Sequence, residues 1–461
     1  MGHTIVAQAT ASGLAGLAVV RVSGDEAFII GDKCFKGKKK IADANSHTIL
    51  YGDFLYDGIV IDKVTCSIFH KPNSYTGENT IEFGTHGGAI IPNQIINALI
   101  EAGCKYAEAG EFTRRAFING KIDLVQAEAV ADIIHSISVP SATISAKQLQ
   151  GGMTNMLDKL RNNLISIAAM IELEMDFAEE DITLSSEKDI LDSIDTAINT
   201  CSDLVRSYHS ANILRSGFVV AIIGEPNAGK STLFNSLLNT QRAIVSSIAG
   251  TTRDFISEII YINDIPIKII DTAGLRETDS IIETYGIEYT HKMLEQANLI
   301  LFINDVSNDD NSDDLLQQIK LKYPNTKIIL VNNKIDLVAN KKHFFNCHTE
   351  LVLASPFPDI INISANKQDA NFVALKNKIA DISKEQLKLN NDILLNERQY
   401  FKLIETINCL NTAKELLLQN TISEILSIEI RNAGKLLGEL TGQSWNEEVL
   451  NSIFDRFCIG K

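Results

Sequence analysis

Several features are missing from this sequence of 461 residues, and each absence narrows what the protein can be. No stretch approaches the roughly 18 uninterrupted apolar residues that a membrane-spanning helix requires. The apolar run at 15–20 ends at Arg21 and has no basic start, and Met1-Gly2 is not followed by the residues of a myristoylation signal. We therefore expect no membrane span, no signal peptide and no N-terminal lipid.

Cysteine is scattered, and no two cysteines form a CxxC pair or stand at zinc-ligand spacing with histidine. The seven positions are Cys34, Cys66, Cys104, Cys201, Cys347, Cys409 and Cys458. An odd, dispersed set is typical of thiols that stay reduced. The pattern predicts a cytoplasmic protein without a structural metal.

Positive charge is in deficit, because 42 Lys+Arg against 58 Asp+Glu leave a net charge of −16. This disfavours a protein coated with positive charge for non-specific nucleic-acid binding, but it leaves room for a local basic surface. The apolar fraction of 45% and the charged fraction of 22% exclude general disorder. At about 150 residues per domain, the length indicates roughly three domains.

Glycine and proline are absent from two long stretches, 153–216 and 359–433. Both residues interrupt helices, so their absence predicts long helices. In the first stretch, Met153, Leu157, Leu160 and Leu164 follow at steps of three and four residues, which is the period of one helix face. We expect the two stretches to pack on each other as one helical domain.

Between these stretches, short apolar runs predict strands at 218–223, 267–270, 299–303, 327–331 and 360–363. Helix-like segments mostly alternate with them, as in an α/β domain with a largely parallel sheet. The predicted fold class is therefore α/β plus α+β. The predicted domains are an α+β domain at 1–120, a helical segment at 121–216, an α/β domain inserted at 217–384 and a second helical segment at 385–461.

The strongest motif runs from Gly224 to Ser231 and reads G-E-P-N-A-G-K-S, which matches G-x-x-x-x-G-K-[ST] after a predicted strand and before a helix. Glycines let backbone N–H groups approach phosphate oxygens, and the helix N-terminus favours negative charge. Lys230 is predicted to reach the β- and γ-phosphates, and Ser231 to bind Mg²⁺. The predicted contacts also include Asn227, Ala228, Gly229 and Thr232. The alternative, an ordinary glycine turn, does not account for the full match.

Three further segments indicate guanine as the base. Asp271-Thr272-Ala273-Gly274 follows a strand, so Asp271 can reach Mg²⁺ through water and Gly274 can donate to the γ-phosphate. Asn333-Lys334-Ile335-Asp336 is similar to the N-K-x-D of the translation-factor-like small GTPases, whose Asp accepts hydrogen bonds from guanine N1 and N2. Ser364-Ala365-Asn366 resembles the last guanine-contacting loop of such proteins.

The segment Gly250-Thr251-Thr252-Arg253-Asp254 lies where a first switch loop belongs, and Thr252 is predicted to be the second Mg²⁺ ligand. Leu275 stands where Ras-type GTPases carry the glutamine that orients water. Hydrolysis therefore needs another group to position the attacking water and another source of positive charge. Glu283 is a candidate for orienting water and Asn227 for holding a monovalent cation, although polar residues in loops are often only solvated.

Together these motifs resemble the MnmE (TrmE) family of tRNA modification GTPases, within the TrmE-Era-like GTPases. The resemblance extends along the whole chain. It is carried by the motifs above and by residues 5–10, 20–24, 75–79, 86–88, 110–121 and the ending Phe457-Cys458-Ile459-Gly460-Lys461. One departure is Ala11-Ser12, where relatives usually carry Pro-Pro.

The resemblance implies a function. Family members act with the flavoprotein MnmG to add an aminomethyl or carboxymethylaminomethyl group to C5 of the wobble uridine, position 34, of certain tRNAs. A tetrahydrofolate derivative, 5-formyl- or methylene-tetrahydrofolate, donates the carbon. The resemblance places Arg21, Glu82, Lys121 and Lys461 at the folate site, and it implies a cytoplasmic homodimer that forms a heterotetramer with MnmG.

The resemblance also implies hydrolysis that K⁺ and facing GTPase domains stimulate, without an arginine finger. The implied K⁺ ligands are Asn227, Ser246, Ile248 and Thr251, and Glu283 matches the family's water-orienting glutamate. The implied switch contacts are Ser246, Ser247, Ile248, Ala249, Gly250, Thr251 and Thr252. Cys458 has an implied role in the modification chemistry, as a nucleophile or as a packing residue.

A second hypothesis is a regulatory GTPase that switches ribosome assembly, of the Era or Der type. The GTPase motifs alone fit both hypotheses. The N-terminal domain, which resembles folate-binding aminomethyltransferase folds, and the Cys-Ile-Gly-Lys ending favour the tRNA enzyme. The C-terminal segment also has no KH-like GXXG module with basic flanks.

Overall fold

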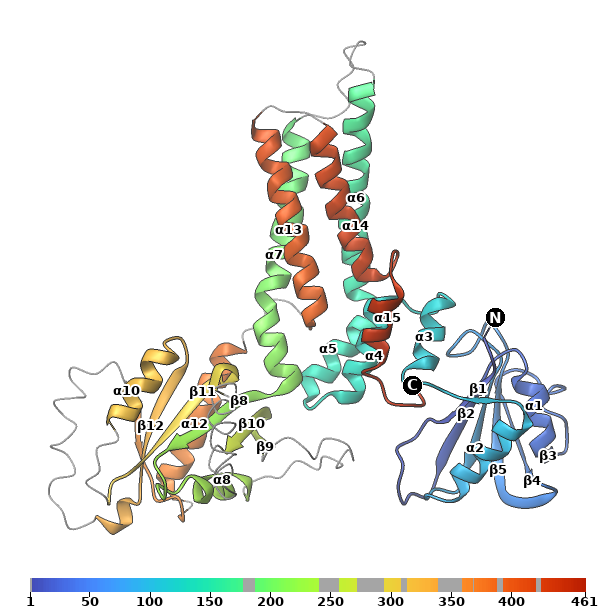
Figure 1. Ribbon diagram of the computed structural model, residues 1–461, viewed down its shortest axis with the longest axis horizontal. Helices are drawn as coiled ribbons and strands as arrows, with labels where there is room; N and C mark the ends of the chain where they lie inside the picture. The colour runs from blue at the N-terminus through green and yellow to red at the C-terminus, as the bar shows by residue number, and fades with distance from the viewer. Residues whose placement is uncertain are drawn as a thin grey trace, which may run out of the picture. The chain divides into compact units, whose positions relative to one another are not determined.

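The computed structural model describes residues 2–176, 187–239, 257–271, 294–307, 313–338, 359–367, 369–387, 393–419 and 424–461. The chain forms two compact units. The first consists of residues 1–134, 145–202 and 398–461, and the second of residues 135–144 and 203–397. Each unit is thus assembled from segments that are far apart in the sequence, and the colours of Figure 1 show this for both.

The first unit begins with a seven-stranded sheet in the order β3-β4-β5-β6-β2-β1-β7. The strands are β1 Ile5–Gln8, β2 Ala18–Ser23, β3 Phe35–Gly37, β4 Thr48–Tyr56, β5 Ile59–Phe69, β6 Thr80–Thr85 and β7 Lys105–Tyr106. Only the β1–β7 pair is parallel. Helices α1 (Ala27–Cys34) and α2 (Ile91–Ala102) pack against the sheet and bury Phe28, Phe54 and Phe83 with it.

Three shorter helices connect this sheet to the long ones: α3 Glu111–Ile118, α4 Leu124–His135 and α5 Val139–Leu149. Asp123 and Gln126 start α4 with reciprocal hydrogen bonds, because each side chain accepts from the other residue's backbone N–H, at 2.8 and 2.9 Å. Phe117 and Leu124 then share a core with Phe454 of α15 (Glu447–Phe454). The end of the chain is therefore held beside α3.

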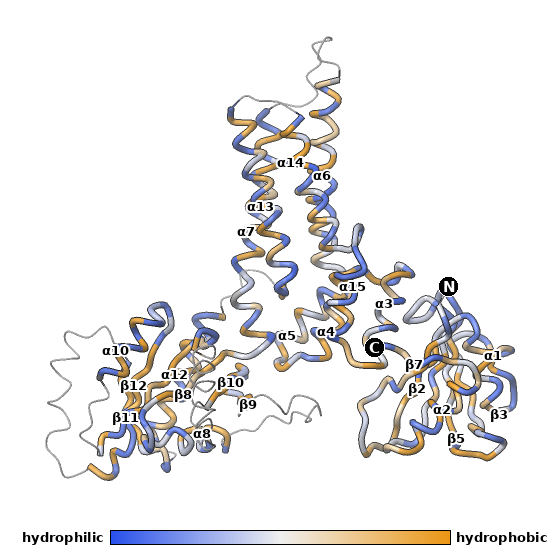
Figure 2. The backbone as a smooth tube through the Cα atoms, viewed as in Figure 1, coloured by the Kyte–Doolittle hydropathy of each residue, from blue (hydrophilic) through white to orange (hydrophobic). Residues whose placement is uncertain are grey.

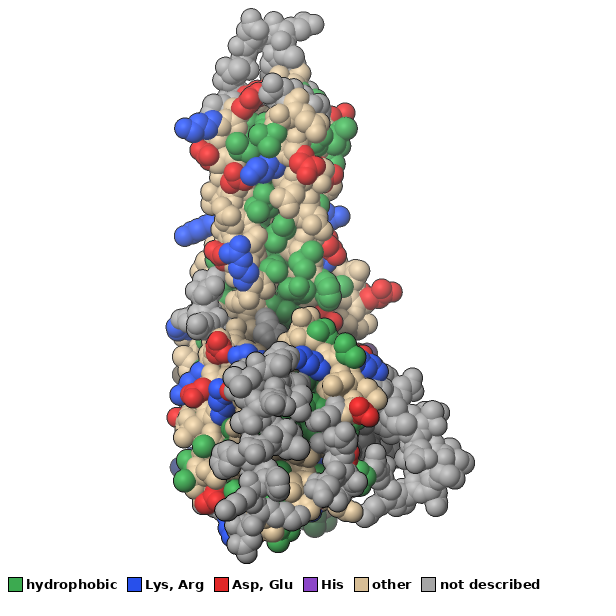
Figure 3. Space-filling model, turned by 90° about the vertical axis from the view of Figure 1, so that its left-hand side faces the viewer, with side chains coloured by type: hydrophobic (Ala, Val, Ile, Leu, Met, Phe, Trp, Pro, Cys, Tyr) green, Lys and Arg blue, Asp and Glu red, His purple; other side chains and the backbone are tan. Residues whose placement is uncertain are grey.

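The long helices are α6 Gly152–Asp176, α7 Glu187–Ser216, α13 Glu397–Leu418 and α14 Glu424–Thr441. Gly434 and Gly438 let α14 approach α6 closely, since a Cβ at these positions would lie 3.3 Å from Ile165 and 3.1 Å from Arg161. An ion pair of 2.6 Å between Asp195 and Lys414 links α7 to α13. Figure 3 shows hydrophobic side chains exposed among charged ones along these helices.

The second unit contains a six-stranded sheet in the order β13-β12-β11-β8-β10-β9, parallel except for β9. Its strands are β8 Phe218–Gly224, β9 Ser257–Ile262, β10 Ile265–Asp271, β11 Leu299–Asp305, β12 Lys327–Asn333 and β13 Ile360–Asn362. Its helices are α8 Lys230–Leu238, α10 Asp313–Lys322, the 3-10 turn η3 Ile335–Leu337 and α12 Ala370–Gln386.

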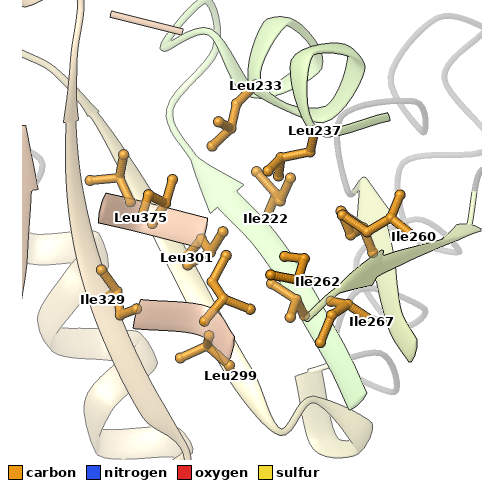
Figure 4. Close-up of a cluster of buried hydrophobic side chains, with 14 of the residues drawn as sticks. Ile222, Leu233, Leu237, Ile260, Ile262, Ile267, Leu299, Leu301, Ile329 and Leu375 are labelled. Carbon is orange, nitrogen blue, oxygen red and sulfur yellow. The ribbon is translucent and has the colours of Figure 1, made fainter. Parts of the chain in front are cut away.

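Apolar residues line both faces of this sheet. On one face Ile222, Leu301 and Ile329 pack with Leu233 of α8 and Leu375 of α12, and Figure 4 shows their side chains meeting. On the other face Phe302 and Leu330 pack with Leu316 of α10. Strands that are buried on both sides are typical of parallel sheets, so the predicted fold class is confirmed for this unit.

The two stretches without glycine and proline pack on each other as expected where α6 meets α14, but the second stretch is divided between two cores. Residues 359–387 supply β13 and α12 of the parallel sheet, whereas α13 and part of α14 belong to the long helices. The lack of helix breakers permits a helix but does not select the core on which it packs. Figure 2 shows apolar and polar residues alternating along these helices, as one buried face requires. In the described ranges, no helix combines the length and apolar character of a membrane span.

Candidate functional site

The predicted nucleotide motifs lie at the carboxyl ends of neighbouring parallel strands. Strands β8, β10, β11 and β12 end at Gly224, Asp271, Asp305 and Asn333. The register pairs Asp271 with Ile222 and Asp305 with Asn333. The carboxyl edge of a parallel sheet is where α/β proteins bind ligands, so one edge brings the separate motifs together.

The loop between β8 and α8 requires its glycines. Gly224 has φ 154°, and a Cβ there would lie 2.2 Å from the carbonyl oxygen of Ile303. Gly229 has φ 96°, and a Cβ there would lie 2.2 Å from Nδ2 of Asn333. Asn227 adopts φ 63°, a left-handed conformation that asparagine tolerates better than most residues. The glycine spacing is therefore a consequence of contact with β11 and β12.

Lys230 begins α8, and its side chain turns back over the loop. Its Nζ donates to the carbonyl oxygens of Gly224, at 3.0 Å, and Glu225, at 2.7 Å, and the residue is only 9% exposed. Ser231 and Thr232 follow in the first helical turn. A buried ammonium group and a helix N-terminus at one loop suit the phosphates of a nucleotide, and the Ser231 hydroxyl is a suitable Mg²⁺ ligand.

Asn333 joins two of the predicted motifs. Its Nδ2 donates to the carbonyl oxygen of Ala228, and its Oδ1 accepts from the backbone N–H of Ala365, both at 2.9 Å. The residue is 2% exposed. It therefore holds the phosphate loop and the loop after β13 in one position. Sequence spacing predicts a nucleotide contact here but does not show this bridging.

The residues predicted to bind the base also contact one another. The hydroxyl of Ser364 donates to Asp336 at 2.8 Å, and Lys334, at φ 63°, pairs with Asp305 at 2.6 Å. Burial alone would raise the pKa of Asp305, but hydrogen bonds from Lys334 and Ser307 hold it below its ordinary value. The sequence analysis missed Asp305. Its only signal is its place after the apolar run 299–303.

Part of the predicted site lies outside the described residues. This applies to Ser246, Ser247, Ile248, Ala249, Gly250, Thr251 and Thr252, to Thr272, Ala273 and Gly274, and to Glu283. Asp271 closes β10, and Asn366 follows Ala365 at an exposed position. The described part of the predicted site therefore consists mainly of the phosphate loop and the guanine-binding segments.

A second group of predicted residues meets in the first unit. Arg21 of β2 and Glu82 of β6 are directly paired across the sheet, with Nε and Oε1 2.8 Å apart. Arg21 also lies 3.5 Å from the carbonyl oxygen of Gly460. Burial, followed by the positive charge of Arg21, lowers the pKa of Lys461. Three of the four predicted folate residues thus gather at one place.

Two aromatic rings that the sequence analysis did not identify flank this group. The guanidinium carbon of Arg21 lies 5.3 Å from the ring centroid of Tyr75 and 5.5 Å from that of Phe112. Lys121 contacts another loop, where its Nζ donates to the carbonyl oxygen of Pro72 at 3.0 Å. The rings and charges suit a flat ligand that carries both hydrogen-bonding edges and negative charge.

Two glycines fix the end of the chain against the N-terminal sheet. Gly460 has φ 98°, and a Cβ there would lie 2.1 Å from the carbonyl oxygen of Gln8. Gly110 has φ 65°, and a Cβ there would lie 2.7 Å from the carbonyl oxygen of Phe454. Ala109 and Ile459 form a β-bridge between these points. The last residues are thus packed in place, although chain ends often fray.

Cys458 lies in this terminal segment as an exposed free thiol. By contrast, Cys66, Cys104 and Cys201 are buried, and burial raises the pKa of each. Buried thiols with raised pKa values are poor nucleophiles. Among these four cysteines, Cys458 is therefore the one with access to a ligand.

Comparison with known proteins gives two family matches that together cover most of the chain. The family described as GTP-binding protein TrmE N-terminus matches residues 4–121, and the family described as MnmE helical domain matches residues 124–458. A tRNA modification GTPase MnmE from Flavobacterium psychrophilum is 41% identical, over 99% of each chain. Proteins of the same name are 40% identical in Flavobacterium johnsoniae, over 99% of each chain, and 39% identical in Christiangramia forsetii, over the full length of both.

Proposed function

The chain belongs to the MnmE family of tRNA modification GTPases, and from this premise we propose that it drives modification of the wobble uridine of tRNA. It is a GTP-hydrolysing enzyme that uses GTP and Mg²⁺. In the proposed reaction it works with a flavoprotein, MnmG, to add an aminomethyl or carboxymethylaminomethyl group to C5 of uridine 34. The full-length match to relatives of that name favours this function over a switch in ribosome assembly.

The proposed GTP site uses the phosphate loop and the guanine-binding segments. Lys230 and the backbone of 227–232 hold the phosphates, Ser231 and Thr252 bind Mg²⁺, and Asp336 accepts hydrogen bonds from the base. Two observations support this. The contacts of Asn333 align the phosphate loop with Ala365, and Ser364 orients the carboxylate of Asp336. A site whose donors are fixed in advance loses less entropy on binding.

The proposed chemistry of hydrolysis rests on K⁺ and Glu283. Asn227, Ser246, Ile248 and Thr251 are the proposed K⁺ ligands, and Glu283 is the proposed group that orients water. A cation near the β–γ bridging oxygen would stabilise charge that develops in the transition state. Replacement by Asn227→Gly removes the amide and suits φ 63°. It should abolish the difference in kcat between K⁺ and Na⁺ while GDP still binds.

The proposed one-carbon donor is a tetrahydrofolate derivative, which supplies the carbon added to uridine. Arg21, Glu82, Lys121 and Lys461 are the proposed contacts. The adjacency of Arg21, Glu82 and the chain end supports a ligand of this kind, because Glu82 can accept from an amino edge and the cations can pair with carboxylates. Cys458 stands two residues before Gly460, whose carbonyl oxygen lies 3.5 Å from Arg21. We propose that Cys458 takes part in the modification step.

We also propose that the protein is a homodimer that forms a heterotetramer with MnmG and acts in the cytoplasm. The N-terminal domain is the proposed dimerisation domain, and facing GTPase domains would complete the K⁺ site. This arrangement couples nucleotide state to subunit contacts, which is how a GTPase can gate a reaction at a distant site.

The observation that carries the proposal is that one chain holds two separate sites, a guanine-nucleotide loop and the cluster of Arg21, Glu82 and the chain end. The test is mass spectrometry of tRNA nucleosides from cells that lack the gene, complemented with the wild-type chain or with Lys230→Ala. We expect the C5-modified wobble uridine to disappear and only the wild-type chain to restore it. Normal modification without the gene would overturn the proposal.

A further inference from the structure

A run of lysines stands out in this acidic chain. Five lysines lie between residues 33 and 40, and no window of eight residues outside this run holds more than three Lys+Arg. Lys36, Lys38, Lys39 and Lys40 are all exposed. Five lysines against Asp32 and Asp43 give residues 32–43 a net charge of +3, whereas the whole chain carries −16. A polyanion would be repelled by most of the protein and attracted here.

Protection of the sheet edge does not account for the run. β3 is the edge strand, and lysine on an edge strand prevents other strands from adding to it. Only Lys36 lies within β3, which ends at Gly37, while Lys38, Lys39 and Lys40 follow the end of the strand. Those three lysines lie beyond the edge strand, so protection of the edge does not explain why they are there. In Figure 2 this part of the tube has the hydrophilic colour.

An exposed tyrosine lies on β4, the strand that pairs with β3. Tyr51 of β4 is 64% exposed, and a Cβ on Gly37 would lie 3.4 Å from the Tyr51 carbonyl oxygen. Lys36 is paired with Asp53 across β3 and β4. Because side chains alternate along a strand and Phe54 is buried, Tyr51 and Asp53 share the open face of the sheet. Lys63 joins them there, with its Nζ 3.3 Å from Asp53.

We propose that Lys36, Lys38, Lys39, Lys40, Lys63 and Tyr51 form an RNA-binding surface. The lysines contact the phosphate backbone, and Tyr51 stacks on one unpaired base. Basic groups beside an exposed aromatic ring on a sheet face are the combination that recognises unpaired RNA, since every base offers a π-face. The choice of RNA over another polyanion rests on the proposed function. The negative charge of Asp53 on the same face would repel phosphate, and its ion pair with Lys63 reduces this repulsion.

The test measures binding of the full-length chain to a transcribed tRNA whose anticodon begins with uridine, over a series of salt concentrations. K38Q/K39Q/K40Q removes three phosphate contacts, so the slope of log K against log salt should fall by roughly two to three. Tyr51→Ala should weaken binding of the tRNA by about fivefold or more, while Tyr51→Phe keeps it and a fully paired RNA duplex shows no effect.

A matched control removes the same three charges elsewhere: K159Q/K188Q/K435Q, at exposed positions on α6, α7 and α14. An unchanged salt slope in K38Q/K39Q/K40Q, or an equal fall in the control, would overturn the inference. A lower molar mass of K38Q/K39Q/K40Q than of the wild type by light scattering would also overturn it, since the lysines would then join copies of the chain. The same holds if the wild-type chain binds anionic vesicles more tightly than tRNA.

The outcome is separable from that of the proposed function. RNA binding is measured directly, while the proposed function depends on the nucleosides of tRNA in cells. If the wild-type chain binds tRNA through these lysines but cells without the gene keep the modified uridine, the proposed function fails and the RNA-binding surface stands. If cells without the gene lose the modified uridine but K38Q/K39Q/K40Q binds tRNA as the wild type does, the proposed function stands and the RNA-binding surface fails.

Discussion

Asn333 donates a hydrogen bond from its side-chain amide to the carbonyl oxygen of Ala228, 2.9 Å away, at a site where Asn333 is 2% exposed. The same side chain accepts from Ala365. The end of β12 therefore sets the position of the phosphate loop. Two motifs 105 residues apart in sequence act as one structural unit because a single buried amide satisfies both.

Replacing Asn333 with alanine should weaken GDP binding by at least tenfold. It should also lower the free energy of unfolding by about 1–3 kcal/mol, because two buried backbone groups lose their partners. Binding is measured with a fluorescent GDP analogue and stability by urea unfolding. Asn366→Ala, at an exposed position in the neighbouring loop, serves as the control and should leave stability unchanged. An equal loss of stability in the two variants would contradict the bridging role.

Gly229→Ala should abolish nucleotide binding. The new Cβ would lie 2.2 Å from Nδ2 of Asn333, and φ 96° is strained for alanine. Gly152→Ala is the matched control, because the nearest atom to its Cβ is the carbonyl oxygen of Lys147 at 3.4 Å. Isothermal titration with GDP compares them. Retained affinity in Gly229→Ala would show that the loop can shift without cost.

Asp336→Asn should change the preferred base from guanine to xanthine. The carboxylate accepts from guanine N1 and N2, whereas an amide can donate to the oxygen that xanthine carries at C2. The ratio of kcat/KM for GTP and xanthosine triphosphate measures the effect, and we expect it to fall by at least 100-fold. Ser364→Ala removes the hydroxyl that holds Asp336 and should lower GTP affinity with less change in that ratio. An unaltered ratio in Asp336→Asn would exclude the base-reading role.

Gly460→Ala should release the chain end from the N-terminal sheet. A Cβ would lie 2.1 Å from the carbonyl oxygen of Gln8, in a residue with φ 98°. We expect loss of modified uridine in cells with an unchanged GTPase rate, since the phosphate loop belongs to the other compact unit. Gly16→Ala, with no atom within 4 Å of its Cβ, should have no effect. A reduced GTPase rate would mean that the chain end acts on hydrolysis as well.

Asp305 predicts a pH dependence. Because the pKa of Asp305 is lower in the folded chain than its ordinary value of 3.8, the unfolded state binds more protons between the two values. Its contribution to stability is therefore present above the ordinary pKa and is lost as pH falls through the folded pKa. Urea unfolding between about pH 5 and about pH 3 should depend less on pH in Asp305→Asn than in the wild type. The exposed Asp381→Asn should behave as the wild type.

Much of the nucleotide site could be predicted because its chemistry depends on local order in the chain. A strand, a glycine loop and a helix that starts with Lys230 form a phosphate site from consecutive residues, so spacing alone reveals it. Asp305 could not be found in this way. Its role depends on Lys334 across the sheet, and one carboxylate after an apolar run carries no signal of its own.

The sequence by itself determined the chemistry of the phosphate loop, the order of the guanine-binding segments and the insertion of a parallel sheet between helical segments. Those features follow from consecutive residues and from apolar periodicity. Only the tertiary structure decided that Asn333 aligns two loops, that Gly460 packs on Gln8 beside Arg21, and that Tyr51 is exposed on the strand that pairs with β3. The physical reason is that consecutive residues do not determine these relationships. Packing joins Asn333 to Ala228 and Gly460 to Gln8 across long stretches of chain, and the register of β3, β4 and β5 sets which residues surround Tyr51.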